Sequence, residues 1–143
     1  MNLTWSCFPK FFQSYSLEQL AEMANHVGLD TLNVVVREGY AVEPNTLTRD
    51  LPRVTAAMRD MGMPPRFATA AYHPRDLLSD ESILAAFGAS GIRDVRIGYY
   101  NYDRSIPPGT QIDEARHQMA ELASQCGRHG VRVVIQAHHG KLF

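Results

Sequence analysis

Side chains able to bind or transform a small molecule lie within, or directly after, short apolar runs of this chain. They are Arg37, Glu38, His73, Arg96, Tyr100, Gln136 and His138. Arginine binds carboxylates and phosphates, and histidine transfers protons or binds metals near neutral pH. The set predicts a site for a small polar molecule, to which an anionic group would bind through the arginines. The alternatives are ion pairs with nearby acids and a buried polar network without a ligand.

The same residues offer little for a metal ion or for a standard catalytic motif. A catalytic metal needs about three converging protein ligands. Glu38 is the single Asp or Glu at the carboxyl end of an apolar run. His138 and His139 are sequence neighbours, so their side chains should point in opposite directions along a strand. The sequence contains neither a phosphate-binding glycine loop nor a GxSxG nucleophile motif. No motif of this kind therefore identifies a reaction.

Five apolar runs are predicted to be strands, and they must position these side chains. They span residues 3–8, 31–36, 66–72, 94–100 and 131–137. Apolar residues at helical spacing predict helices over residues 17–27, from 46 or 48 to 61, 80–89 and about 111–129. Pro52 should then lie in the first turn of its helix. Repeated strand–helix–strand units predict an α/β fold with parallel strands, whose site lies beyond the carboxyl ends of the strands.

Strand alternation sorts the candidate residues by face, because successive side chains of a strand point to opposite sides. The shared faces are Asn33 with Arg37, Arg96 with Tyr100, and Gln136 with His138. Polar groups are costly beneath a packed helix, so these faces should point away from the helices. We therefore expect Asn33, Arg96 and Gln136 to face one polar interior or cleft.

Composition describes an ordinary globular protein and excludes several classes of function. The length of 143 residues predicts a single domain, residues 1–143. A net charge of −1 provides no basic field for nucleic acid, and no apolar stretch approaches the roughly 18 residues of a membrane span. Cys7 and Cys126 lack zinc or redox spacing, and the first residues lack a signal-peptide pattern. We expect a soluble cytoplasmic protein that binds a small molecule, with neither nucleic acid nor membrane as a partner.

Four segments occur in the order and spacing of a known family. They are Gly28-Leu-Asp-Thr-Leu-Asn33, the loop from Val36 to Pro44, the strand from Ile92 to Tyr100 and the closing Ile135-Gln-Ala-His-His-Gly140. Together they resemble the sugar phosphate isomerase/epimerase family, which has the xylose-isomerase-like TIM barrel. The resemblance implies a partial (β/α)8 barrel covering the first five of eight strands, and a sugar or sugar phosphate as the small-molecule partner.

The resemblance also implies a reaction and a cofactor. Family members use one divalent metal (manganese, cobalt, magnesium or zinc) to assist a proton shift next to a sugar carbonyl. Their usual ligands end strands five to eight, and Gln136 lies where the first of them, a glutamate, is usual. His138 matches the family in residue type, whereas Asn33 stands where a Gly-x-Glu pattern is common. The match thus implies a metal in a full-length parent, with none bound and no turnover by this chain alone.

Two alternatives to a barrel portion remain open from the sequence. A five-stranded flavodoxin-like binding or signalling module has the right length. A half-barrel could instead associate with a second copy through open sheet edges, without catalysis. A monomer with a covered fifth strand would favour the first, and a dimer closed edge to edge would favour the second.

Overall fold

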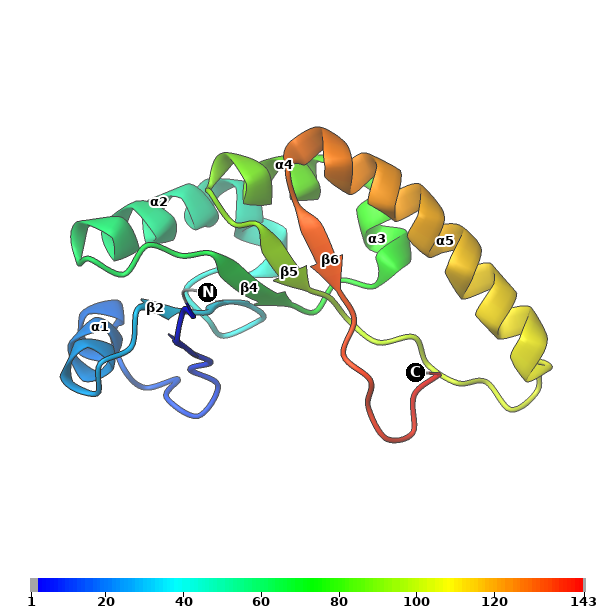
Figure 1. The fold of residues 1–143 in the computed structure, drawn as a ribbon, viewed down its shortest axis with the longest axis horizontal. Helices are drawn as coiled ribbons and strands as arrows, with labels where there is room; N and C mark the ends of the chain where they lie inside the picture. Colours follow the sequence, from blue (N-terminus) through cyan, green and yellow to red (C-terminus); the bar gives the residue numbers. More distant parts are fainter. Residues whose placement is uncertain (1–2, 143) are drawn as a thin grey trace.

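The computed structural model describes residues 3–142, in which parallel strands alternate with helices (Figure 1). The strands are β1 (Ser6–Cys7), β2 (Thr31–Leu32), β3 (Val34–Val36), β4 (Phe67–Ala70), β5 (Asp94–Arg96) and β6 (Arg132–Val134). The helices are α1 (Leu17–His26), α2 (Leu47–Asp60), α3 (Pro74–Ser79), α4 (Ser82–Ala89) and α5 (Pro108–His129), with a 3-10 turn, η1, at Pro44–Thr46. The predicted α/β class is confirmed.

The strands of residues 3–142 pair in chain order, and each pairing is parallel. β1 pairs with β2, and β3, β4, β5 and β6 pair in sequence. Figure 1 shows α2, α4 and α5 arching over one face of the four-stranded sheet, and no helix of the described residues covers the other face. A flavodoxin-like sheet has the strand order 2-1-3-4-5 with helices on both faces. The flavodoxin-like alternative is therefore wrong, and the observed order is that of a barrel wall.

The helix-covered face of the sheet forms the hydrophobic core. Ala68, Ala70 and Val95 are fully buried there. The helices contribute fully buried side chains to the same core, namely Leu51, Met58, Leu84, Phe87 and Leu122. Burying one large apolar side chain stabilises a fold by roughly 1.5–3 kcal/mol. Because strand side chains alternate, the residues between these core positions point to the uncovered face.

The strands are shorter than the apolar runs predict. The run 31–36 divides at Asn33, whose N–H donates to the Cys7 carbonyl (2.8 Å), so that β2 pairs with β1 and β3 with β4. β5 ends at Arg96 because the chain then turns against the end of β4. There the Gly98 N–H donates to the Tyr72 carbonyl (2.7 Å), and a Cβ at Gly98 would lie only 2.8 Å from that oxygen. The predicted extension of the last strand to residue 137 is also wrong, since β6 ends at Val134.

Helix α3 was not expected from the sequence, which predicts one helix over residues 80–89 at this point. The His73 Nδ1 accepts the Arg75 N–H (3.2 Å), and an Asp76 carboxylate oxygen accepts the His73 N–H (2.7 Å). Pro74 occupies the first helical position, where its missing N–H costs nothing. Histidine is not among the usual capping residues, which explains why the pattern does not predict this start.

Pro52 lies in the interior of α2, not in its first turn as expected. Its missing N–H removes one helical hydrogen bond. The helix continues because Leu47, Leu51 and Met58 are buried along one face, and such packing supplies most of the stability of helices in proteins. α5 begins at Pro108, slightly before the predicted residue 111. No helix within residues 3–142 is long and apolar enough to cross a lipid bilayer.

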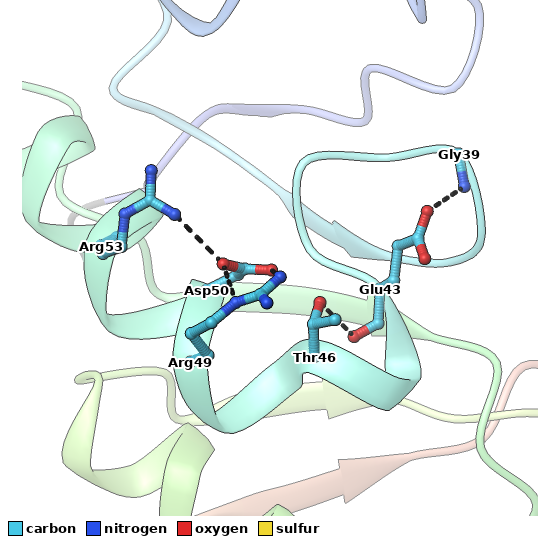
Figure 2. A network of polar contacts seen from close by, with 6 residues as sticks. All are labelled: Gly39, Glu43, Thr46, Arg49, Asp50 and Arg53. Atoms are coloured by element: carbon cyan, nitrogen blue, oxygen red, sulfur yellow. Dashed lines mark hydrogen bonds and ion pairs between the residues drawn. The ribbon is translucent and has the colours of Figure 1, made fainter.

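The polar loop after β3 is fixed by its own contacts (Figure 2). A Glu43 carboxylate oxygen accepts the Gly39 N–H (3.0 Å) and so closes the loop. Just beyond it, Asp50 accepts two hydrogen bonds from Arg49 (2.8 and 2.9 Å) and one from Arg53 (3.1 Å). The hydrogen bond from Arg49 holds the pKa of Asp50 well below its usual range. These acids are therefore bonded locally and do not pair with the arginine that opens the loop.

Candidate functional site

An open concavity of about 530 Å³ lies on the uncovered face and extends to the carboxyl ends of β3, β5 and β6. Arg37, Arg96, Gln136 and His138 of the predicted set line it together. Asn33 lines it as well, so the structure brings Asn33, Arg96 and Gln136 to one cleft, as strand alternation predicts. This is the place at which parallel α/β folds build their sites.

A buried polar pair forms the floor of the concavity. Asn33 and Thr69 are 8% and 5% exposed, and the Asn33 side-chain N–H donates to the Thr69 hydroxyl oxygen (3.0 Å). The Asn33 carbonyl oxygen Oδ1 is buried without a hydrogen-bond partner among the described residues. Leaving a buried acceptor unpaired costs roughly 1–3 kcal/mol. The Asn33 Oδ1 can therefore accept a hydrogen bond from a ligand donor that enters the concavity.

Arg37 and Arg96 point to the concavity without a carboxylate partner. No ion pair within residues 3–142 includes either of them, which removes the ion-pair alternative for this part of the chain. Aromatic rings lie beside them instead. The Arg96 guanidinium carbon is 4.2 Å from the centre of the Tyr99 ring, and that of Arg37 is 6.0 Å from the centre of the Phe8 ring. Such contacts hold a guanidinium in place and leave its N–H groups able to bind a ligand.

The concavity has a positive electrostatic character. Lys10 lines it beside the two arginines, and its lining within residues 3–142 contains no Asp or Glu. A smaller concavity continues from it, lined by Arg37, Arg96 and His73, again without an acid from the described residues. A low-dielectric wall strengthens the field of such charges. The arrangement therefore favours anionic or strongly polar ligands over cations.

His73 lies at the edge of this site and has two roles. It caps α3 through its Nδ1 and lines the smaller concavity beside Arg37 and Arg96. Burial lowers the pKa of His73 below its usual value, so the ring is neutral near pH 7. Because Nδ1 accepts a hydrogen bond, Nε2 carries the proton. His73 can therefore donate one hydrogen bond to a ligand oxygen.

Two predicted residues lie elsewhere. Tyr100 does not share a face with Arg96; its ring packs against His73 (5.3 Å between centres) and lines a neighbouring concavity with Arg75 and Glu114. Burial raises the pKa of Tyr100 to about 12, so its hydroxyl stays protonated. Glu38 is exposed in the turn after β3 and does not line the two concavities that contain the arginines. The substrate-binding roles predicted for both stay predictions.

Sequence reasoning missed Tyr99, Thr69 and Lys10. Tyr99 takes the place expected for Tyr100 because β5 ends at Arg96, after which strand alternation no longer applies. Thr69 could have been found, since alternation along residues 66–72 places it opposite the core alanines. Lys10 follows β1 in a turn, and no periodic signal marks it.

A more enclosed crevice lies between α1, α2 and the strand they cover. Its lining includes Leu17, Leu20, Val54 and Met58, and no charged side chain of the described residues lines it. A crevice of this kind offers apolar contact and little chemistry. The concavity with the arginines is therefore the candidate site.

The residues of this site do not fit a divalent metal ion. Residues 3–142 contain no group of three or more His, Cys, Asp or Glu side chains that could hold one. Gln136, at the position expected for a glutamate ligand, shares the concavity with arginine and lysine side chains that repel a cation. The metal of a full-length parent stays a prediction.

Solved structures of three enzymes or enzyme-like proteins resemble the chain over about half of their own length. Mannonate dehydratase from Streptococcus suis serotype 2 matches with a TM-score of 0.66 at 13% identity, over 94% of this chain and 51% of that chain. D-Allulose 3-epimerase from Methylomonas sp. matches with a TM-score of 0.61 at 11% identity, over 96% and 50%. A xylose isomerase domain protein from Planctomyces limnophilus matches with a TM-score of 0.58 at 13% identity, over 81% and 47%.

No protein-family model and no curated protein sequence matches the chain. The structural likeness to xylose isomerase-like TIM-barrel enzymes covers about half of their chains. At these identities it establishes the fold, and the predicted partial barrel is thereby confirmed.

Proposed function

We propose that residues 1–143 form a single domain, the substrate-side half of a sugar or sugar phosphate isomerase/epimerase-like barrel. The observation that carries this proposal is the polar concavity that extends to the carboxyl ends of β3, β5 and β6, where barrels hold their sites. Two of the similar structures are named as an allulose epimerase and a mannonate dehydratase. We extend their class of ligand, a sugar or sugar acid, to this chain. We also propose a cytoplasmic location, with neither nucleic acid nor membrane as a partner.

The parent reaction in this proposal is a proton shift next to a sugar carbonyl. Asn33 would accept a hydrogen bond from a sugar hydroxyl, and the His73 Nε2–H would donate one to a sugar oxygen. No carboxylate within residues 3–142 lines the concavity, so none is placed there to act as a general base. These residues bind and orient the sugar, and we expect no turnover from residues 1–143 alone.

Assays on two lengths of chain test this function. The protein expressed from the complete reading frame should interconvert at least one member of a panel of ketoses, aldoses and their phosphates. Residues 1–143 should bind the same sugar, detected by chemical-shift changes at Asn33 and His73 in NMR spectra, without converting it. Absence of turnover by the folded longer protein, with and without added divalent metal, would refute the isomerase proposal.

Self-association of the half-barrel is the second candidate, and exposed apolar side chains favour it. Leu3, Trp5 and Phe11 are 68%, 63% and 87% exposed, and β1 beside them pairs only with β2 among the described strands. An unpaired strand edge next to apolar surface invites a second copy. Sedimentation velocity should then give twice the 16.0 kDa monomer mass, and Trp5→Ser should restore the monomer. A monomer at all concentrations would count against this candidate.

A further inference from the structure

Arg96 is a buried cation whose counter-ion is missing from the described residues. The residue is 6% exposed on the uncovered sheet face, and its Nε has no hydrogen-bond partner among the described residues. Burying a charge is costly unless the charge is paired. The Tyr99 ring compensates for part of this cost but accepts no strong hydrogen bond from the N–H groups. Arg96 therefore lacks the acceptor that a buried guanidinium requires.

Arg37 provides a second guanidinium at the same cleft. It lines both concavities that Arg96 lines, and its Nε is likewise buried without a hydrogen-bond partner among the described residues. The acid nearest along β5 on the same sheet face is bonded elsewhere: Asp94 accepts hydrogen bonds from Arg132 (2.8 and 3.1 Å) on the next strand.

We propose that an oxyanion, the phosphate or carboxylate of a charged sugar, binds between Arg37 and Arg96. Planar guanidinium groups match the oxygen spacing of both anions and form strong charge-assisted hydrogen bonds with them. The unpaired Asn33 Oδ1 is a hydrogen-bond acceptor and so cannot bind the anion itself. It accepts a hydrogen bond from a hydroxyl group of the same ligand. Lys10 adds to the positive field at the rim of the concavity. This inference rests on the proposed function for the sugar, whereas the anion site depends only on the arginines.

Calorimetric titration of residues 1–143 with matched ligands tests the proposal. The probes are D-fructose 6-phosphate, D-gluconate, inorganic phosphate and, as the uncharged match, D-fructose. At least one sugar anion should bind ten times more tightly than D-fructose, and its affinity should fall as salt is added. Tighter binding of the phosphate than of gluconate identifies phosphate as the preferred anion, and the reverse identifies carboxylate. Equal affinities for charged and uncharged sugars overturn the proposal.

Arginine variants locate the anion. Arg37→Met and Arg96→Met should each weaken binding of the anion at least tenfold and leave the affinity for D-fructose unchanged. Arg116→Met is the matched control, because Arg116 is exposed on α5 and pairs with Asp113. If Arg96→Met does not fold, the anion affinities of Arg37→Met and of the charge-retaining Arg96→Lys test the assignment instead. Unchanged anion binding in Arg37→Met, or an equal loss in Arg116→Met, refutes the assignment.

Failure of this inference and failure of the proposed function give different results. Binding of D-fructose without preference for an anion would leave the sugar-binding function standing and remove the anion site. Tight binding of an anion through Arg37 and Arg96, with no turnover by the longer protein, would support the anion site and refute the isomerase function.

Discussion

Replacement of Gly88 by alanine should destabilise this protein, although alanine is the better helix former. Gly88 lies in α4 where this helix packs on the end of α5. A Cβ at Gly88 would overlap the backbone carbonyl oxygen of His129 and lie 3.3 Å from its carbonyl carbon. Backbone atoms cannot rotate away, so the two helices would have to separate.

The magnitude follows from two opposing effects. Glycine to alanine in a helix interior gains about 1 kcal/mol. Separation of α4 from α5 disturbs Leu84, Phe87 and Leu122, all of which are fully buried, and forced overpacking costs typically 1–3 kcal/mol, occasionally more. Because the overlap is with backbone, we place the cost at the upper end and expect a net loss of about 2 kcal/mol. For a chain of this size that lowers Tm by roughly 6–10 °C.

Urea unfolding followed by circular dichroism measures this effect, and Gly127 provides the control. Gly127 also lies within a helix, α5, and nothing lies within 4 Å of a Cβ built on it. Gly127→Ala should therefore raise the free energy of unfolding by roughly 0.5–1 kcal/mol. The prediction depends on the opposite signs of the two substitutions. If Gly88→Ala is as stable as Gly127→Ala, α4 does not pack closely on α5 at Gly88.

Two further predictions concern single polar contacts. Tyr72→Phe removes the hydrogen bond from the buried hydroxyl to the Pro44 carbonyl (2.8 Å) and should lower the free energy of unfolding by about 1 kcal/mol in urea titrations; an unchanged unfolding midpoint would contradict it. Hydrogen bonds from Arg128 and His129 lower the pKa of Glu81 from 4.5 to about 2, so its stabilising effect is complete above pH 4.5 and is lost as the pH falls toward 2. Glu81→Gln should flatten the acid-unfolding curve in this range, and curves that superimpose with the native one would show that the contact contributes nothing.

Local signals predicted the order of elements and several of their ends. Serine is a preferred helix cap, and the hydroxyl of Ser16, directly before α1, accepts the Gln19 N–H (3.2 Å). Glycine commonly ends helices, and Gly130, directly after α5, adopts the left-handed conformation (φ 64°) that favours glycine. Both features depend on residues within one helical turn. Alternation likewise placed Asn33 and Arg96 on one face, because each lies within or next to a regular strand.

Features that depend on distant segments could not be predicted in this way. β5 ends where Gly98 closely approaches the Tyr72 carbonyl. Tyr99, and not Tyr100 as expected, therefore lies beside Arg96. The start of α3 depends on a histidine cap that propensity does not favour. Propensity and alternation describe neighbours along the chain, and these outcomes depend on neighbours in space.

The sequence by itself determined that strands and helices alternate, which faces carry polar side chains, and that their site lies at the carboxyl ends of parallel strands. It left open whether Arg37 and Arg96 pair with acids, since charge counts do not show which groups meet. Tertiary structure decided this by lining their concavities without an acid among the described residues and by bonding Asp94 to Arg132. Ion pairing depends on distance in the folded chain, so only the fold shows that both guanidinium groups lack a carboxylate among the described residues.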